Sequence, residues 1–173
     1  MGQAPMLMQN CNRIVLFLAM LLVGLPCLAS TMRGLVVGVT DGDTVTVLDH
    51  TRRQYKVRLM GIDAPEKSQP YGHKSKESLS RLAYGKSVSV MYNKKDKYGR
   101  MVGKITVDEV DICLEQIKAG MAWHYKKYET EQTLSDRFMY ASAEDEAKLK
   151  VRGLWQDPHP VPPWAWRKQQ RGR

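Results

Sequence analysis

The sequence contains little cysteine and no ligand pattern for a transition metal. Of its 173 residues, three are cysteines: Cys11, Cys27 and Cys113. If the first 29 residues are removed, only Cys113 remains, so no internal disulfide can form and the core must stabilise the fold unaided. The four histidines are scattered without the spacing of a zinc site, and no serine nucleophile motif lies near them. We therefore assign the histidines no chemistry and interpret Cys113, in an apolar context, as a small buried hydrophobic residue.

Long hydrophobic runs are also missing, with one short exception near the N-terminus. Arg13 precedes an apolar run over residues 14–25, which is too short to span a bilayer comfortably. Small residues at Cys27 and Ala29 follow it, as they do before the cleavage site of a secretory signal peptide. We expect residues 1–29 to be a signal peptide, and the mature protein to be secreted or periplasmic without stable membrane association. The alternative is an uncleaved membrane anchor.

Positive charge is in clear excess. The chain has 27 lysines and arginines against 18 aspartates and glutamates, a formal net charge of +9 at pH 7. Such an excess favours a polyanionic partner, either nucleic acid or an anionic surface. A basic membrane-surface protein is disfavoured, because the sequence offers no amphipathic basic helix of the required kind.

Short segments of alternating apolar residues begin at Gly34 and are separated by turn residues, a pattern typical of antiparallel strands. No internal repeat or low-complexity domain interrupts them. Three helices are predicted: one over residues 75–84, a short one that begins after a cap at Asp111, and one over residues 133–151. With five strands and about three packed helices, the sequence predicts a mainly β fold with α-helices, a five-stranded OB-fold barrel.

Two further expectations concern the C-terminal third. In the last long helix, Leu134, Phe138 and Ala141 recur at helical spacing and are predicted to form its apolar stripe. Residues 158–173, rich in proline, tryptophan and arginine, contain too many prolines for a regular element. We expect them to form a C-terminal tail that runs over the surface of a domain spanning residues 30–157.

Carboxylates and an arginine gather where two predicted strands end. In a strand through Tyr55, Arg58 lies on the side opposite Val57 and Leu59, so it can face a ligand while they face the core. The segment DGDT alone is typical of a hairpin turn, and no glutamate follows at the spacing of an EF-hand loop. If the barrel brings Asp43 beside Asp63, the crowded carboxylates require a cation, and oxygen ligands select a hard one.

Three stretches taken together resemble a known family. DGDTVTV, VRLMGIDAPE and DKYGR occur in the order of the signature stretches of the staphylococcal nuclease family, and the resemblance extends from about Gly34 to Trp155. It implies a calcium-dependent phosphodiesterase on an OB barrel, which degrades DNA and RNA to products with 3′-phosphate ends. The rival interpretation is a non-catalytic OB-fold protein that only binds nucleic acid.

The resemblance also assigns roles to residues. It implies that calcium is held by the carboxylates of Asp43 and Asp63 and by the backbone carbonyl of Ala64, where the family often has threonine. Glu66 matches the residue proposed as general base or water-positioner. Two arginines match those that bind the reacting phosphate, Arg58 and Arg100.

Substrate contacts are expected from two further segments. Lys97 and Tyr98, inside DKYGR, are predicted to reach a phosphate of the bound strand. The segment WHYKKY, residues 123–128, interleaves aromatic residues with lysines as single-stranded nucleic-acid sites do. It makes Tyr125 a candidate sugar or base contact, whereas Trp123 can equally belong to the core. We expect a monomer that prefers single-stranded DNA or RNA.

Overall fold

The computed structural model describes residues 30–172. The predicted signal peptide, residues 1–29, lies outside the described residues. Within residues 30–172, no helix combines the length and the apolar character needed to cross a membrane.

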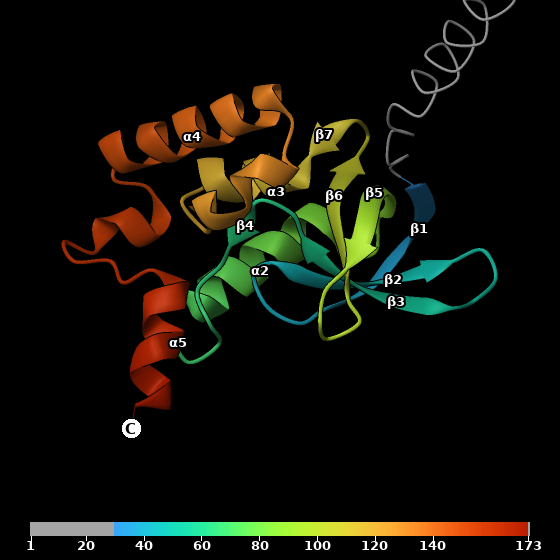
Figure 1. The fold of residues 1–173 in the computed structure, drawn as a ribbon, viewed down its shortest axis with the longest axis horizontal. Coiled ribbons are helices and arrows are strands. Elements are labelled where there is room, and N and C mark those ends of the chain that lie inside the picture. The colour runs from blue at the N-terminus through green and yellow to red at the C-terminus, as the bar shows by residue number, and fades with distance from the viewer. Residues whose placement is uncertain (1–29, 173) are drawn as a thin grey trace, which may run out of the picture.

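Five strands form a closed barrel (Figure 1). The strands are β1 (Ser30–Val39), β2 (Thr44–Asp49), β3 (Gln54–Leu59), β5 (Ser87–Lys95) and β6 (Met101–Val107). Neighbours pair antiparallel in the order β3-β2-β1-β5-β6, and a parallel pairing between β3 and β6 closes the barrel. The predicted five-stranded OB-fold barrel is therefore confirmed, although its closing pair is parallel rather than antiparallel.

Short strands extend this framework. β7 (Val110–Asp111) pairs with the end of β6. β4 (Ile62–Asp63) leaves the barrel after β3 and pairs antiparallel with β8 (Trp123–His124). This second pairing fixes the segment after Leu59 against the WHYKKY segment, which lies far away in the sequence.

The three predicted helices are present. They are α2 (Gly72–Ala83), which begins before the expected residue 75, α3 (Ile112–Lys118) and α4 (Leu134–Leu149). The side chain of Asp111 caps α3 by accepting a hydrogen bond from the Leu114 amide at 3.1 Å, as the sequence indicated. Thr133 caps α4 in the same way through the Asp136 amide. The short 3₁₀ helices η2 (Lys126–Glu131) and η3 (Gly153–Gln156) flank α4.

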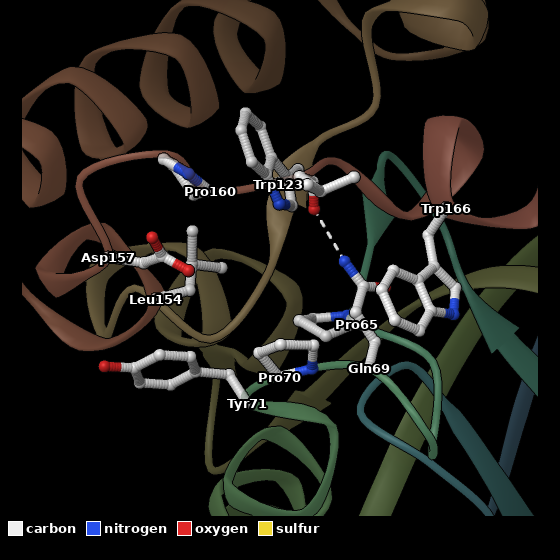
Figure 2. A pocket seen from close by; sticks show the side chains of 10 residues that line it. Pro65, Gln69, Pro70, Tyr71, Trp123, Leu154, Asp157, Pro160 and Trp166 are labelled. Atoms are coloured by element: carbon white, nitrogen blue, oxygen red, sulfur yellow. Dashed lines mark hydrogen bonds between the residues drawn. The ribbon is translucent and has the colours of Figure 1, made fainter. Parts of the chain in front are cut away.

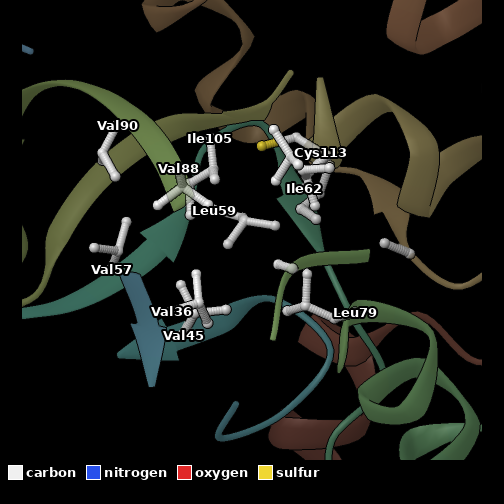
Figure 3. Close-up of a cluster of buried hydrophobic side chains, with 14 of the residues drawn as sticks. Val36, Val45, Val57, Leu59, Ile62, Leu79, Val88, Val90, Ile105 and Cys113 are labelled. Atoms are coloured by element: carbon white, nitrogen blue, oxygen red, sulfur yellow. The ribbon is translucent and has the colours of Figure 1, made fainter. Parts of the chain in front are cut away.

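The hydrophobic core fills the barrel and continues beneath α2 and α3 (Figure 3). Val57 and Leu59 of β3 point into it, as their alternation with Arg58 required. Cys113 is fully buried, and this burial raises the pKa of its thiol to about 12. The interpretation of Cys113 as a buried hydrophobic residue is confirmed.

The predicted apolar stripe of α4 is wrong. Leu134 and Phe138 are 80% and 73% exposed. The inward face is instead formed by five other residues, Asp136, Tyr140, Ala143, Glu144 and Ala147. Polar contacts set this face, because the Tyr140 hydroxyl donates to Asp111 and the Lys104 ammonium pairs with Asp136. The spacing of apolar residues could not reveal that polar residues of α4 would be buried by pairing with residues on other elements.

The C-terminal tail also differs from expectation, because it contains a helix, α5 (Pro163–Arg171). Pro162 is its N-cap and Pro163 its first residue, a position where the missing amide hydrogen costs no helical hydrogen bond. The prolines thus precede the helix instead of preventing it. In Figure 1, α5 lies at the lower left, at the end of the chain.

The turn between β1 and β2 is packed tightly against two helices. The Gly42 carbonyl accepts a hydrogen bond at 2.8 Å from the side chain of Gln116, a fully buried residue of α3. A Cβ atom on Gly42 would overlap the Ser75 hydroxyl of α2 and lie 2.7 Å from the Ala64 Cβ. The DGD segment is therefore held rigidly, and it carries Asp43 into a fixed position.

This close approach predicts that Gly42→Ala lowers the free energy of unfolding by about 1–3 kcal/mol, the usual cost of overpacking. Gly38→Ala is the matched control on the same hairpin, since its added Cβ would lie 3.5 Å from Thr46, an ordinary contact. We expect the control to change stability by less than about 0.5 kcal/mol. Equal effects of the two substitutions in urea denaturation would contradict this packing account.

Candidate active site

Arg58 joins two acidic residues at the end of the barrel. Its Nη1 atom lies 2.9 Å from Asp43 Oδ2, and its Nη2 atom lies 2.9 Å from Asp63 Oδ1. Strand pairing places Arg58 opposite Thr44, so Asp43 is the first residue beyond the β2 ladder. Nη1 also donates to the carbonyls of Leu59 and Ile62, which fixes the guanidinium group. The predicted convergence of Asp43 and Asp63 is present.

The same cluster includes Ala64. Its backbone amide donates to Asp43 Oδ2 at 2.8 Å, while Asp43 Oδ1 accepts a hydrogen bond from the Thr44 hydroxyl. The Asp63 side chain is only 1% exposed. Burial raises the pKa of Asp63, and the bonds from Arg167 and Arg58 oppose this rise. The negative charges are therefore crowded, and they are stable here only because cationic groups face them.

A second sign of crowding is the carboxylate of Asp41. Burial and the neighbouring charge of Asp43 raise the pKa of Asp41 to about 6. Its Oδ1 atom accepts a hydrogen bond from the Asp43 amide, which orders the turn.

The donors at this position fit a hard cation. Within residues 30–172, no group of three or more histidine, cysteine, aspartate or glutamate side chains could hold a metal ion by itself. The two carboxylates of Asp43 and Asp63 and the Ala64 carbonyl are all oxygen donors, the kind that Ca²⁺ binds. The protein thus supplies part of a shell, and water or substrate oxygens would have to supply the rest.

Glu66 lies on the rim of the cluster. Its side chain is 39% exposed, so water can reach the carboxylate. The Glu66 amide donates to Gln69 Oε1 at 3.1 Å, which fixes the backbone after Pro65. Within residues 30–172, the side-chain partner of its carboxylate is Arg167, at 2.6 Å.

Arg100 approaches the cluster from the turn between β5 and β6. Its Nε atom pairs with Asp96 Oδ2 at 2.7 Å, and its Nη1 atom lies 3.4 Å from the hydroxyl of Thr44, next to Asp43. Asp96 also accepts hydrogen bonds from the amides of Tyr98 and Arg100, which shapes the turn. The Arg100 guanidinium carbon lies 5.4 Å from the centre of the Tyr98 ring. Asp96 therefore orients Arg100 toward Asp43.

All of these groups line one groove of about 660 Å³. Each residue named by the sequence contributes to it: Asp43, Arg58, Asp63, Ala64, Glu66, Lys97, Tyr98, Arg100 and Tyr125. Tyr98 is 68% exposed, and Tyr125 also lines the groove. The structure brings the predicted residues together, while their individual roles remain predictions.

Several groove residues were missed by sequence reasoning. The most closely engaged is Arg167 of α5, whose Nη2 atom lies 2.7 Å from Asp63 Oδ2. Lys94, Lys95, Lys127, Tyr128 and Arg171 also line the groove. Lys94 and Lys95 directly precede the DKYGR motif, and Lys127 and Tyr128 belong to the WHYKKY segment, in which Tyr125 was the residue singled out. Arg167 gave no such signal, because it follows a proline-rich stretch outside every motif.

The protein is thus an OB barrel whose basic groove surrounds a carboxylate cluster, an arrangement suited to a polyanion. Comparison with known proteins makes this specific. Residues 56–157 match the family model described as staphylococcal nuclease homologue. The chain belongs to the staphylococcal nuclease family, as the three sequence stretches suggested.

Relatives bear names consistent with this family. A protein named uncharacterized endonuclease from Escherichia coli O157:H7 is 42% identical over 143 residues, which cover 82% of this chain and 89% of that protein. Another of that name, from Haemophilus influenzae, is 43% identical over 136 residues, covering 79% and 73%. A staphylococcal-like nuclease from Arabidopsis thaliana is 38% identical over 120 residues, covering 69% of this chain and 35% of the plant protein. The protein is accordingly a nuclease, a hydrolase acting on nucleic acid, and the non-catalytic alternative is disfavoured.

The ion pairs of Arg58 predict a large effect on stability. Arg58→Met leaves Asp43 without its guanidinium partner, so the free energy of unfolding should fall by about 3 kcal/mol, the lower part of the range for broken buried pairs. The lower part of that range of free energies applies because Asp63 keeps Arg167 as a cationic partner in the variant. Arg33→Met, at an exposed position of β1, is the control. Guanidinium denaturation that shows no difference between the two variants would contradict the described network.

Proposed function

We propose that the protein is an exported, calcium-dependent nuclease that hydrolyses DNA and RNA, preferably single-stranded, and leaves 3′-phosphate ends. The observation that carries this proposal is the meeting of Asp43, Asp63, Glu66, Arg58 and Arg100 in one groove. A protein that only binds nucleic acid has no need for this combination of carboxylates and arginines.

The two arginines are suited to hold the reacting phosphate. A guanidinium group donates parallel hydrogen bonds to phosphoryl oxygens and opposes the charge that grows in the transition state. Asp96 pairs with the Nε atom of Arg100. The two terminal nitrogens of the Arg100 guanidinium group are therefore directed into the groove. Arg58 is fixed by two carbonyls and two carboxylates, so it is already oriented when substrate arrives.

The residues that would hold calcium are Asp43 and Asp63 through their carboxylates and Ala64 through its backbone carbonyl. Bound there, the ion would supply positive charge to neutralise the scissile phosphate. The side chain of Ala64 contributes no hydroxyl group, but a carbonyl ligand does not need one.

Glu66 is the candidate for handling the attacking water. Its carboxylate is accessible from the groove and lies on the rim of the carboxylate cluster, so it can orient a water molecule or take its proton. The water oxygen would bond to phosphorus as the 5′-oxygen leaves, which gives a 3′-phosphate and a 5′-hydroxyl end. Lys97, Tyr98 and Tyr125 would contact the flanking strand, and the aromatic rings favour unpaired bases.

The cellular location and assembly are part of the proposal. Export rests on the signal-peptide pattern of residues 1–29, and it would give a secreted or periplasmic protein that acts as a monomer and does not stay bound to a membrane. Cleavage after Ala29 would make Ser30 the first residue of the mature chain.

A first test measures the release of acid-soluble nucleotides from denatured DNA. We expect release with calcium, loss of release with a chelator, and a reduction by about 10²- to 10⁴-fold in Glu66→Ala, the scale of a lost acid–base group. Glu77→Ala, at an exposed position of α2 outside the groove, should match the wild type. Release that is indifferent to both the chelator and Glu66→Ala would refute the mechanism.

A second test concerns the transition-state role of the arginines. Arg100→Ala should raise the barrier by about 3–4 kcal/mol, so kcat falls by roughly 10²- to 10³-fold, as for the loss of one such donor. Arg81→Ala, on the exposed side of α2, controls for the lost positive charge. Turnover close to wild type in a folded Arg100→Ala variant would remove Arg100 from the mechanism.

A further inference from the structure

The C-terminal segment with helix α5 is anchored by contacts with two distant parts of the chain. In the first part, residues 65–71, Gln69 Nε2 donates to the Val161 carbonyl at 2.6 Å, and Trp166 lies over Pro65 and Gln69 (Figure 2). In the second part, the Trp164 ring stacks on Tyr125, with ring centres 5.4 Å apart and planes 17° apart. The helix therefore has a defined position beside the predicted base-contact residue.

This position brings the Arg167 guanidinium between two carboxylates. Nη2 bonds to Asp63 Oδ2 at 2.7 Å, and Nη1 lies 2.6 Å from Glu66 Oε1 and 3.2 Å from Asp63 Oδ1. Charge-assisted bonds of this length and two-pronged geometry are the strong kind. One group thus connects a buried carboxylate to an accessible one.

The connection matters more for Glu66 than for Asp63. Asp63 is almost fully buried and is also held by Arg58. The Glu66 side chain is 39% exposed, and among the described residues its carboxylate is held by Arg167. A free glutamate side chain would populate several rotamers, and ordering it costs free energy at each turnover. Arg167 supplies that order in advance.

We propose that Arg167 is a positioning residue, which holds the Glu66 carboxylate beside Asp63 so that helix α5 completes the active site. The inference rests on the proposed function of Glu66. The competing possibility is that Arg167 only anchors the tail, in which case its loss would affect stability and not the working of Glu66.

The first experiment compares Arg167→Gln with Lys168→Gln in the full chain. Lys168 is the next residue of the same helix, carries the same charge and is exposed. We expect Arg167→Gln to lower kcat by about 10- to 100-fold, the scale for losing an outer partner that orients a functional group, with a much smaller change in KM. Lys168→Gln should lower kcat by less than about twofold. Equal kcat values for the two variants overturn the proposal.

A double-mutant cycle distinguishes a role of Arg167 in positioning Glu66 from a role in anchoring the tail. If Arg167 acts through Glu66, Arg167→Gln should reduce the residual rate of Glu66→Gln by less than about twofold. If the fold-losses in kcat of the two single variants multiply in the double variant, Arg167 does not act through Glu66 and the proposal fails. Should Arg167→Gln not fold, Arg167→Lys replaces it in the cycle, because it keeps the charge but loses the two-pronged geometry.

Calcium binding without substrate gives a readout independent of activity. Arg167→Gln removes a positive charge from beside Asp63, so calorimetry should show tighter calcium binding, on the order of tenfold. Arg167→Lys should bind calcium as the wild type does and recover only part of kcat. Weaker binding in Arg167→Gln would show that Arg167 maintains the Asp63 site as a whole instead of positioning Glu66, and this would overturn the proposal.

The outcomes separate this inference from the proposed function. If the wild type releases no nucleotides with calcium, or if Glu66→Gln is as active as the wild type, the proposed function fails and the role of Arg167 fails with it. If the wild type is active, Glu66→Gln is impaired and Arg167→Gln is not, only the inference about Arg167 is overturned.

Discussion

The ion pairs of Arg58 with Asp43 and Asp63 are the interaction on which the site depends. Three backbone segments must meet for these pairs to form: the DGD turn, the end of β3 and the short strand β4. The β2–β3 pairing sets Thr44 opposite Arg58 and so places Asp43, while the pairing of β4 with β8 fixes the segment that carries Asp63. The barrel and this second, smaller sheet together determine the position of the charges in the groove.

Both positive and negative side chains surround this interaction. The chain is strongly basic, and lysines from β5 and η2 line the groove. At its centre, however, carboxylates lie close together, and burial, with a smaller contribution from the charge of Asp43, raises the pKa values of Asp41 and Asp63. Basic banks attract a polyanion, while an acidic centre repels it unless a cation intervenes. This contrast supports the proposal that a divalent ion binds here.

Much of the barrel and of its site could be predicted from local pattern. Alternation put Val57 and Leu59 in the core and left Arg58 to face the groove, and the three motifs marked where the loops meet. Longer-range features could not be predicted in this way. The prediction of the inward face of α4 was wrong, because Tyr140 and Asp136 are held by polar partners on other elements. The contact between Arg167 and Asp63 joins residues 104 apart in the sequence, and it depends on the packing of Trp164 and Trp166 and on the Gln69–Val161 hydrogen bond.

We propose that Asp43 and Asp63 form one cation site that faces Arg58 and Arg100, the arginines proposed to bind phosphate. The most informative experiment is a crystal structure determined from crystals of the protein grown in the presence of calcium. We expect an ion within about 2.3–2.6 Å of oxygens from Asp43, Asp63 and the Ala64 carbonyl, on the side of the groove where Arg100 lies. Calcium bound at another place, with these three groups contacting only protein atoms, would contradict this proposal.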